Sequence, residues 1–525
     1  MKKIYITLGV LLLATFAMAY LYFSNLNTEN SANDLSLNAV AKNSGIVFSF
    51  ENDKSFYEIL SGQDLLQNVL GETKSKQLKN LRDNLISLPS IFNAIDGQKV
   101  YIGILPVADS INFIIGTQLK SGNEPAKLLS HLNSKKIKSK KTGEVYELTF
   151  SDSTTIFFAN KEKLVLISNS PSALVPLLTA QSSEDQDFAK YIKANTRLSK
   201  NTLANLYIDF NKTPALLKNV LSNNINGELN LFKDQHAYAA LSYSFGKEKL
   251  LFNGNTTVED PKNYFSLFSN LPEQQLTIDN IMPEKTANYA IYAIADYKLW
   301  QDELNKWMLA NQQEEKVKQN IDAINQKYRV DLRQIFSRYF KNQLATFQLN
   351  SGEKFGAIAL SNGEKLGQFL LDLSGEYAPE IKIFKDPNIP FAFFGEPFKK
   401  FERPFYTIID NYMVMANNAS SIQVFLNSYK ANKLLVNDED YIGFGDQLSS
   451  AATMVFYVNH KNSNDIFGRN LKMPYYKQYQ SKTGFKSYHA FCYQLSGDHG
   501  KFLSNLLLYK KPTKIIIQDT TNKNQ

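Results

Sequence analysis

The stretch LVLISNSPS at residues 164–172 is matched by YMVMANNAS at residues 412–420. In both, an apolar run ends at a small residue and continues through asparagine into a segment with helical spacing. This pattern predicts a buried strand followed directly by a helix. Ser170 and Pro171 strengthen the prediction, because serine caps a first helical turn and proline suits the first helical position.

Further matches flank this pair and follow the same order along the chain. The offset between matched positions stays between 241 and 250 residues, and a collinear series at a nearly constant offset predicts a duplication. The further matches are residues 46–50 with 290–294, 100–105 with 344–349, Leu119 with Leu360, Leu198-Ser199 with Leu448-Ser449, Tyr207-Ile208 with Tyr457-Val458, and Tyr243 with Tyr493.

Each copy predicts the same succession of strands and helices. Short apolar runs separated by turn residues are typical of antiparallel strands, and inserted helical patterns then indicate an α+β unit with helices covering one face of the sheet. The second copy adds a long charged helical stretch at 300–328. In the first copy the expected strands are 46–50, 99–105, 112–119, 145–150, 155–159, 164–168, 203–210, 237–245 and 250–258, with helices around 56–70, 76–95 and 124–132.

The predicted organisation is an N-terminal membrane segment followed by two tandem similar units. A linker with Pro261, Pro272 and Pro283 separates the units. The predicted divisions are 1–23 as a transmembrane anchor or signal peptide, 24–45 as a polar tether, 46–259 as repeat 1, 260–285 as a connector, 286–511 as repeat 2, and 512–525 as a tail.

The N-terminal segment determines the predicted compartment. Lys2 and Lys3 precede an uncharged run at residues 4–23, which as a helix spans about the 30 Å hydrocarbon core of a bilayer. The two lysines favour a cytoplasmic N-terminus and a body outside the cytoplasm, on the periplasmic side of the cell membrane. Ala17-Met18-Ala19 offers a cleaved signal peptide as the alternative, and both readings export the body.

Composition excludes several classes of protein. The 525 residues carry 58 Lys and Arg against 50 Asp and Glu, a bias too mild for nucleic-acid binding. Cys492 is the single cysteine, so there is neither an internal disulfide nor a cysteine-based metal site. A lysine cluster is expected to be a solvated loop, with contact to anionic lipid or glycan as the alternative. Its members are Lys135, Lys136, Lys138, Lys140 and Lys141.

No motif predicts catalytic, cofactor-binding or metal-binding residues. The chain lacks the glycine-rich phosphate loops, the nucleophile elbow and the H-E-x-x-H pattern. Its histidines never stand four residues apart, which favours ordinary surface or sheet positions. They are His131, His236, His460, His489 and His499.

Three other features have a structural and a functional interpretation. The acidic group Asp438–Asp440, like Glu184–Asp187 in the other copy, is best explained as a helix start rather than a cation site. Asn169 and Asn417 stand at strand-to-helix junctions, where capping is favoured over anion binding. Asn418 is the other possible cap in the second copy. A phenylalanine-rich stretch indicates core packing, with a ligand groove or partner surface as the alternative. It contains Phe391, Phe393, Phe394, Phe398, Phe401 and Phe405.

The arrangement resembles a family of membrane-anchored bacterial envelope proteins known only as a domain of unknown function. The resemblance rests on the anchor, the two copies, Leu198-Ser199 before Tyr207-Ile208-Asp209, and the connector residues Leu271-Pro272 and Ile281-Met282-Pro283. It implies anchoring and an extracytoplasmic location, and it supplies no catalytic residues.

The sequence therefore favours a non-enzymatic binding or scaffolding protein whose partners are the membrane, through residues 4–23, and an envelope protein, glycan or lipid. A carrier of lipid or another apolar ligand and an envelope hydrolase with an unrecognised site are the two alternatives.

Overall fold

The structure is a computed structural model that describes residues 34–52, 72–86, 89–107, 109–120, 137–179, 187–196, 202–222, 236–246, 249–481 and 484–510. The predicted membrane segment at 1–23, the tail at 512–525 and the predicted helices at 56–70 and 124–132 lie outside these residues. None of the described helices is both long and apolar enough to span a membrane.

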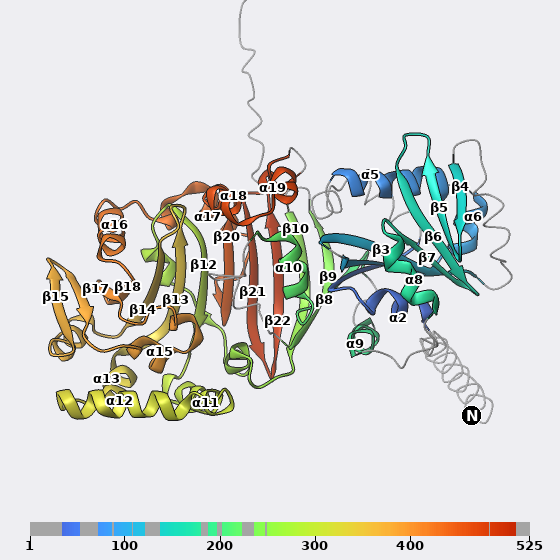
Figure 1. The fold of residues 1–525 in the computed structure, drawn as a ribbon. Coiled ribbons are helices and arrows are strands. Elements are labelled where there is room, and N and C mark those ends of the chain that lie inside the picture. The colour runs from blue at the N-terminus through green and yellow to red at the C-terminus, as the bar shows by residue number, and fades with distance from the viewer. Residues whose placement is uncertain are drawn as a thin grey trace, which may run out of the picture.

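The first half of the chain builds ten strands and several short helices, in the order expected for an antiparallel meander with insertions (Figure 1). The strands are β1 (Ile46–Glu51), β2 (Lys99–Val107), β3 (Ser110–Gln118), β4 (Ile137–Thr142), β5 (Val145–Phe150), β6 (Thr155–Lys161), β7 (Leu164–Ser168), β8 (Asn205–Asp209), β9 (Ala237–Gly246) and β10 (Lys249–Val258). The helices are α2 (Leu35–Ala41), α5 (Glu72–Leu81), α6 (Pro89–Ile95), α8 (Pro171–Thr179), α9 (Asp187–Asn195) and α10 (Thr213–Val220).

The second half contributes the remaining strands and a larger set of helices. The strands are β11 (Gln274–Gln275), β12 (Thr286–Ala293), β13 (Phe340–Leu349), β14 (Lys354–Leu360), β15 (Ser374–Ala378), β16 (Ile381–Phe384), β17 (Phe405–Ile409), β18 (Tyr412–Ala416), β19 (Ala451–Ala452), β20 (Met454–Asn459), β21 (Ala490–Asp498) and β22 (Lys501–Tyr509). The α-helices are α11 (Tyr297–Ala310), α12 (Glu314–Tyr328), α13 (Leu332–Tyr339), α14 (Gly363–Phe369), α15 (Ile389–Phe394), α16 (Ala419–Lys430), α17 (Glu439–Gly445), α18 (Asn464–Asn470) and α19 (Met473–Gln480).

Twenty of the strands form one continuous sheet, and every pairing in it is antiparallel. The α+β class and the largely antiparallel sheet predicted from the sequence are thus confirmed. The sheet twists strongly, so that β3 and β7 run nearly across the direction of β20 to β22 in Figure 1. From edge to edge the order is β4-β5-β6-β7-β3-β2-β1-β8-β9-β10, then β22-β21-β20-β12-β13-β14-β18-β17-β16-β15.

The two halves meet where β10 pairs with β22, a contact that we call the seam. Its register places Lys249 opposite Tyr509 and Thr257 opposite Lys501, with Asn253 opposite Asn505 near the middle. The last strand of the first half is thereby hydrogen-bonded to the last strand of the second half, and both halves belong to one body.

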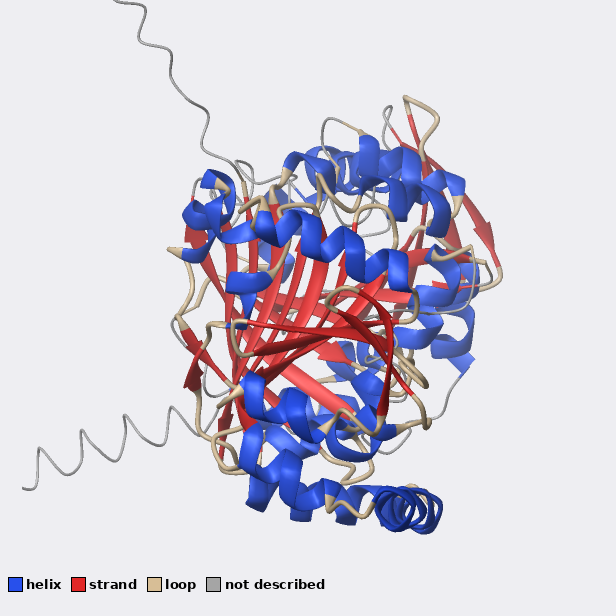
Figure 2. Cartoon of the chain, turned by 90° about the vertical axis from the view of Figure 1, so that its left-hand side faces the viewer, coloured by secondary structure: helices blue, strands red, loops and turns tan. Residues whose placement is uncertain are grey.

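Helices cover both faces of the sheet, whereas the sequence predicts helices on one face only (Figure 2). One large core lies on a single face and runs through both halves, under α5, α6 and α11 to α15. On the opposite face, one core lies under α2, α8 and α9, and another under α16 and α17. The reason is visible in β7, where all five residues are buried, because a strand apolar on both faces requires a layer on each.

Two predicted linkers are packed segments instead. Leu35–Ala41, inside the predicted tether at 24–45, form helix α2, and Asp34 caps it by accepting from the Leu37 amide at 3.0 Å. Leu37 and Val40 are buried, so any tether ends no later than Asp34. The predicted connector at 260–285 also packs, with Phe268 in the large core and Ile281 in the core on the other face of the sheet.

The long helix predicted at 300–328 is broken into α11 and α12. The break falls at residues 311–313, where Gln312 adopts a left-handed backbone with φ of 58°. Trp307 lies at the end of α11 and donates from its indole nitrogen to the Lys262 carbonyl at 2.7 Å. This bond ties α11 to the predicted connector.

Candidate functional site

A buried polar cluster lies at the seam and consists of Thr256 on β10, Tyr493 on β21 and Ser504 on β22. The Thr256 hydroxyl hydrogen-bonds the Tyr493 hydroxyl and lies 2.8 Å from the Ser504 hydroxyl. All three residues are at most 4% exposed. Burial raises the pKa of Tyr493 to about 12, so its phenol stays protonated and able to donate. The cluster is therefore neutral at physiological pH.

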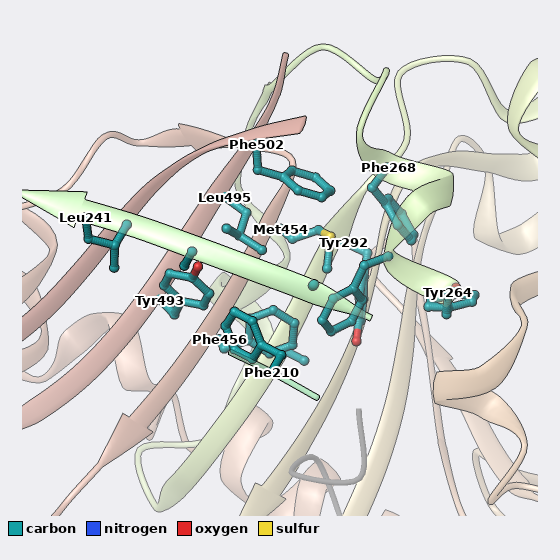
Figure 3. Packing of buried hydrophobic residues seen from close by; sticks show 14 of the residues in the cluster. Phe210, Leu241, Tyr264, Phe268, Tyr292, Met454, Phe456, Tyr493, Leu495 and Phe502 are labelled. Atoms are coloured by element: carbon teal, nitrogen blue, oxygen red, sulfur yellow. The ribbon is translucent and has the colours of Figure 1, made fainter. Parts of the chain in front are cut away.

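Apolar side chains from both halves surround this cluster. Figure 3 shows Phe210, Tyr493, Leu495 and Phe502 gathered on one face of the sheet, and the Phe210 and Tyr493 ring centroids are 6.4 Å apart. A small cavity lies among them, and its volume, measured for the centre of a water-sized sphere, is about 10 Å³. That volume accommodates about one water and no acyl chain. The cavity is lined by Phe210, Ala237, Thr256, Val258, Phe265, Tyr493, Leu495 and Phe502.

The helices α10 and α18 make a second contact across the seam. Leu221 and Leu471, which follow these helices, form an isolated antiparallel bridge. The Ser222 amide donates to the Asn470 carbonyl, and the Lys472 amide donates to the Val220 carbonyl, both at 2.8 Å. Each helix end therefore gives and receives one bond of equal length.

Another buried polar group joins the predicted connector to the second half. Tyr441 on α17 donates to the Asp279 carboxylate at 2.8 Å and lies 2.9 Å from the Tyr289 hydroxyl on β12. Burial raises the pKa of the Asp279 carboxyl above its usual range. These bonds fix the connector against the sheet and its helix, which is a structural role.

Lys212 holds helix α2 against the first half of the sheet. Its ammonium donates to the carbonyls of Ala41, Lys42 and Ser44 at 3.1, 3.0 and 3.4 Å. These carbonyls lie at the C-terminal end of α2, where a cation interacts favourably with the helix dipole. Burial lowers the pKa of Lys212, and Asp209 at 3.5 Å opposes that shift.

The described histidines do not belong to a group of side chains that could hold a metal ion. The structure brings His460 and His489 together, because the His460 amide donates to the His489 carbonyl at 3.0 Å. The His460 Nδ1 lies 3.0 Å from the Tyr488 carbonyl, and burial lowers the pKa of His460 to about 4. His236 lies 3.9 Å from Asp260, and His499 occupies the exposed turn before β22. His131 lies outside the described residues, and nowhere within them do three potential metal-binding side chains gather.

The acidic group at 438–440 is a helix start, as the sequence predicts. The Asp438 carboxylate accepts from the Asp440 and Tyr441 amides at 2.8 and 3.1 Å and caps α17. Asp187 is the first residue of α9 in the other half, while Glu184 and Asp185 lie outside the described residues.

The strand-to-helix asparagines do not cap their helices. The Asn169 side chain accepts from the Phe113 amide at 2.9 Å and donates to Asn112 at 2.7 Å, so it bonds the neighbouring strand β3. The Asn417 side chain donates to the Lys400 carbonyl at 2.9 Å. Asn418 occupies the N-cap position of α16 without a side-chain cap bond. The capping prediction is wrong for Asn169 and Asn417, because their amides hold neighbouring segments instead, and for Asn418 it holds in position but not in the side-chain bond.

Five of the six phenylalanines in the phenylalanine-rich stretch are buried, as the favoured interpretation predicts, and Phe405 on β17 is partly buried. Phe394, Phe398 and Phe401 are fully buried on α15 and the turn after it, and they belong to the large core. The Phe336 and Phe393 ring centroids are 4.5 Å apart, which packs this stretch against α13.

The lysine cluster is an edge strand rather than a loop. Lys138, Lys140 and Lys141 lie on β4, which pairs only with β5 among the described residues, and all three are exposed. Lysines on an edge strand discourage pairing with another chain, which explains the composition. Lys135 and Lys136 lie outside the described residues.

Sequence reasoning missed the seam cluster. Tyr493 is noticed only as a match of Tyr243, and Thr256 and Ser504 are small polar residues within strands. The one available signal is a hydroxyl at an inward position of an otherwise apolar strand, which needs a buried partner.

No known family model matches the chain, and no curated protein matches it. Among solved structures, crystal forms I and III of TP0453 are 12% and 11% identical to it, with TM-scores of 0.23 and 0.24. They cover 43% and 44% of this chain and 79% and 82% of their own. Likeness at this level says nothing about what this chain does.

Proposed function

We propose that this chain is a non-catalytic binding or scaffolding protein of the cell envelope, built from two copies of one α+β unit. The copies are residues 46–259 and 286–511. The membrane segment at 4–23 would hold the body outside the cytoplasm, as in the family of unknown function that the sequence resembles.

The observation that carries the proposal is the common order of strands in the two halves. In the first half the order from the outer edge is β4-β5-β6-β7-β3-β2-β1-β8-β9-β10, and in the second it is β15-β16-β17-β18-β14-β13-β12-β20-β21-β22. Replacing each strand by its counterpart in chain order turns one series into the other. Independent origins would rarely give ten strands one shared, non-sequential order.

The register of β3 with β7, compared with that of β14 with β18, adds support, whereas the match of 46–50 with 290–294 is two residues out of the register that β1 and β12 keep with their neighbours. The sequence alignment matches Leu119 with Leu360 and Leu164 with Tyr412. Gln118 lies opposite Leu164 in the first half, and Ala359 lies opposite Tyr412 in the second. Residues that lie opposite each other on β3 and β7 in the first half are thus aligned with residues that lie opposite each other on β14 and β18 in the second half.

The seam supports a two-fold relation between the copies. In a two-fold contact each bond has a symmetric counterpart, and a residue on the axis meets its own equivalent. The pair of amide bonds at Ser222 and Lys472 has this reciprocity, and Leu221 bridges Leu471, its match at an offset of 250 residues. A body of this kind presents each of its outer surfaces twice.

Duplicated surfaces fit a partner that is itself repeated or two-fold, such as a polymeric glycan or a dimeric envelope protein. Two weak contacts on a rigid body then combine, because the second forms at high effective concentration. The lipid-carrier alternative gains no support from the seam cavity, which accommodates no acyl chain.

Two experiments test the proposal. A topology reporter fused after residue 510 should be active only on the periplasmic side, and cytoplasmic activity would exclude the proposed location. Binding of the body to purified envelope glycan should show two equivalent sites per chain. One site per chain, or an unchanged signal with a heat-unfolded control, would contradict the bivalent scaffold.

A further inference from the structure

The seam departs from two-fold symmetry at the polar cluster. With Asn253 and Asn505 as equivalent positions, the counterparts of Thr256 and Ser504 are Leu508 and Phe252. The register of β9 with β10 and of β21 with β22 likewise makes Leu241 the counterpart of Tyr493. All three counterparts are apolar and lie in the large core.

The seam therefore has one polar and one apolar locus, related by the same two-fold axis. At the polar locus, Thr256 of the first half meets Tyr493 and Ser504 of the second. At the apolar locus, Leu508 of the second half takes the place of Thr256. Phe252 and Leu241 of the first half take the places of Ser504 and Tyr493. Each half thus contributes polar side chains to one locus and apolar side chains to the other.

Pairing two like halves would break this complementarity. If first halves of two chains paired in the same register, each Thr256 would face Phe252 and Leu241 of the other chain and lose its hydroxyl partners. If second halves paired, Leu508 would press against Tyr493 and Ser504 in the space that Thr256 fills. A buried hydroxyl without a partner costs its full desolvation, and an overfilled core is strained.

We propose that the Thr256, Tyr493 and Ser504 cluster selects the partner at the seam, so that each half pairs with the unlike half and a chain closes on itself instead of joining a second copy. This inference rests on the proposed duplication. The cluster acts by making the like pairing worse, which is a common route to specificity between similar surfaces.

The position of Asn253 allows a direct test in the full chain. Opposed residues on antiparallel strands have Cα atoms about 4.5–5.5 Å apart, within the range that a disulfide bridges. A single Asn253→Cys reporter in a Cys492→Ala background can form a dimer-linking disulfide at the seam only if two first halves pair, because the axis places the same residue of both chains in opposition.

The experiment refolds this reporter chain from urea at micromolar concentration, oxidises it, and measures the disulfide-linked dimer by non-reducing electrophoresis and light scattering. The reporter alone should remain almost wholly monomeric. Adding Thr256→Val, which keeps the side-chain shape and removes the hydroxyl, should raise the dimer fraction by at least about tenfold. Thr155→Val, the same substitution on strand β6, which is paired on both sides and lies away from the seam, should leave it unchanged.

Equal dimer fractions with and without Thr256→Val would overturn the proposal, as would abundant dimer in the reporter alone. If Thr256→Val fails to refold, Thr256→Leu, which copies the residue at the counterpart position, replaces it in the same comparison. The double variant Asn253→Cys/Asn505→Cys should form a disulfide within the monomer. Its failure would contradict the seam and the two-fold relation between the copies, whereas its success with no Thr256 effect would contradict only the selection.

Discussion

Asn253 and Asn505 lie directly opposite each other where β10 pairs with β22, and the pairing extends four residues on either side of them. The two asparagines are separated by almost half of the chain, yet the strands that carry them hold the two halves of the sheet in one register. A change at the seam should therefore affect the stability of both halves together.

Gly254→Ala should destabilise the protein by about 1–3 kcal/mol, the usual cost of forcing extra volume into a packed interior. A Cβ at Gly254 would lie 2.0 Å from the Ala240 carbonyl oxygen, a backbone atom of β9 that cannot rotate away. Urea unfolding measures the loss. Gly445→Ala is the matched control, because its Cβ meets nothing within 4 Å, and an equal loss there would contradict the explanation.

Lys212→Met should loosen helix α2, because three carbonyls at its C-terminal end would lose their donor. We expect a loss of about 1–3 kcal/mol and faster amide hydrogen exchange in residues 35–41. Lys218→Met, in the helix α10 that Lys212 precedes and with its side chain exposed, is the control. Unchanged exchange in α2 would show that packing alone holds this helix.

His460 should make the protein less stable as the pH falls. Its folded pKa of about 4 lies below the usual value near 6.5, so stability present above pH 6.5 is lost as the pH falls towards 4. The loss from this group is about 3 kcal/mol.

The measurement compares urea unfolding at pH 7 and pH 4.5 for the natural chain and for His460→Phe, which copies Phe210 at the proposed equivalent position. The variant should lack this component of the pH dependence. An identical pH dependence in both proteins would rule out His460 as its source.

Lys138→Val/Lys140→Val should make the protein self-associate, because the edge strand β4 would lose two of its three lysines and keep only Lys141 to discourage pairing along its free edge. Sedimentation or light scattering measures the change. Lys316→Val/Lys318→Val removes the same charge from exposed positions of helix α12 and should leave the protein's association state unchanged. Association of both variants would point to net charge instead.

The strands were predictable where local pattern and turn residues agree. The runs at 145–150, 155–159 and 164–168 became β5, β6 and β7 almost residue for residue, because each is short, apolar and bounded by turns. Helix α2 escaped prediction because its 7 residues carry too few turns to show a period.

The seam could not be predicted, because nothing in a strand sequence names its partner. The strands β10 and β22 both carry apolar residues on both faces. This pattern indicates that both faces of each strand are covered, but it does not identify the segments that cover them. The candidate cluster depends on that pairing, since Thr256 meets Ser504 only across it. The match of Tyr243 with Tyr493 also needs correction under the proposed duplication. The registers of β9 with β10 and of β21 with β22 make Leu241 the position equivalent to Tyr493.

The seam also determines when the two halves can pair during synthesis of the chain. The edge of β10 is complete once Val258 has left the ribosome, but its partner β22 ends at Tyr509. At about 5–20 residues per second, roughly 10–50 s of translation separate the two. During that interval the first half exposes an apolar edge strand without its partner. A chaperone that shields nascent chains would therefore bind at β10.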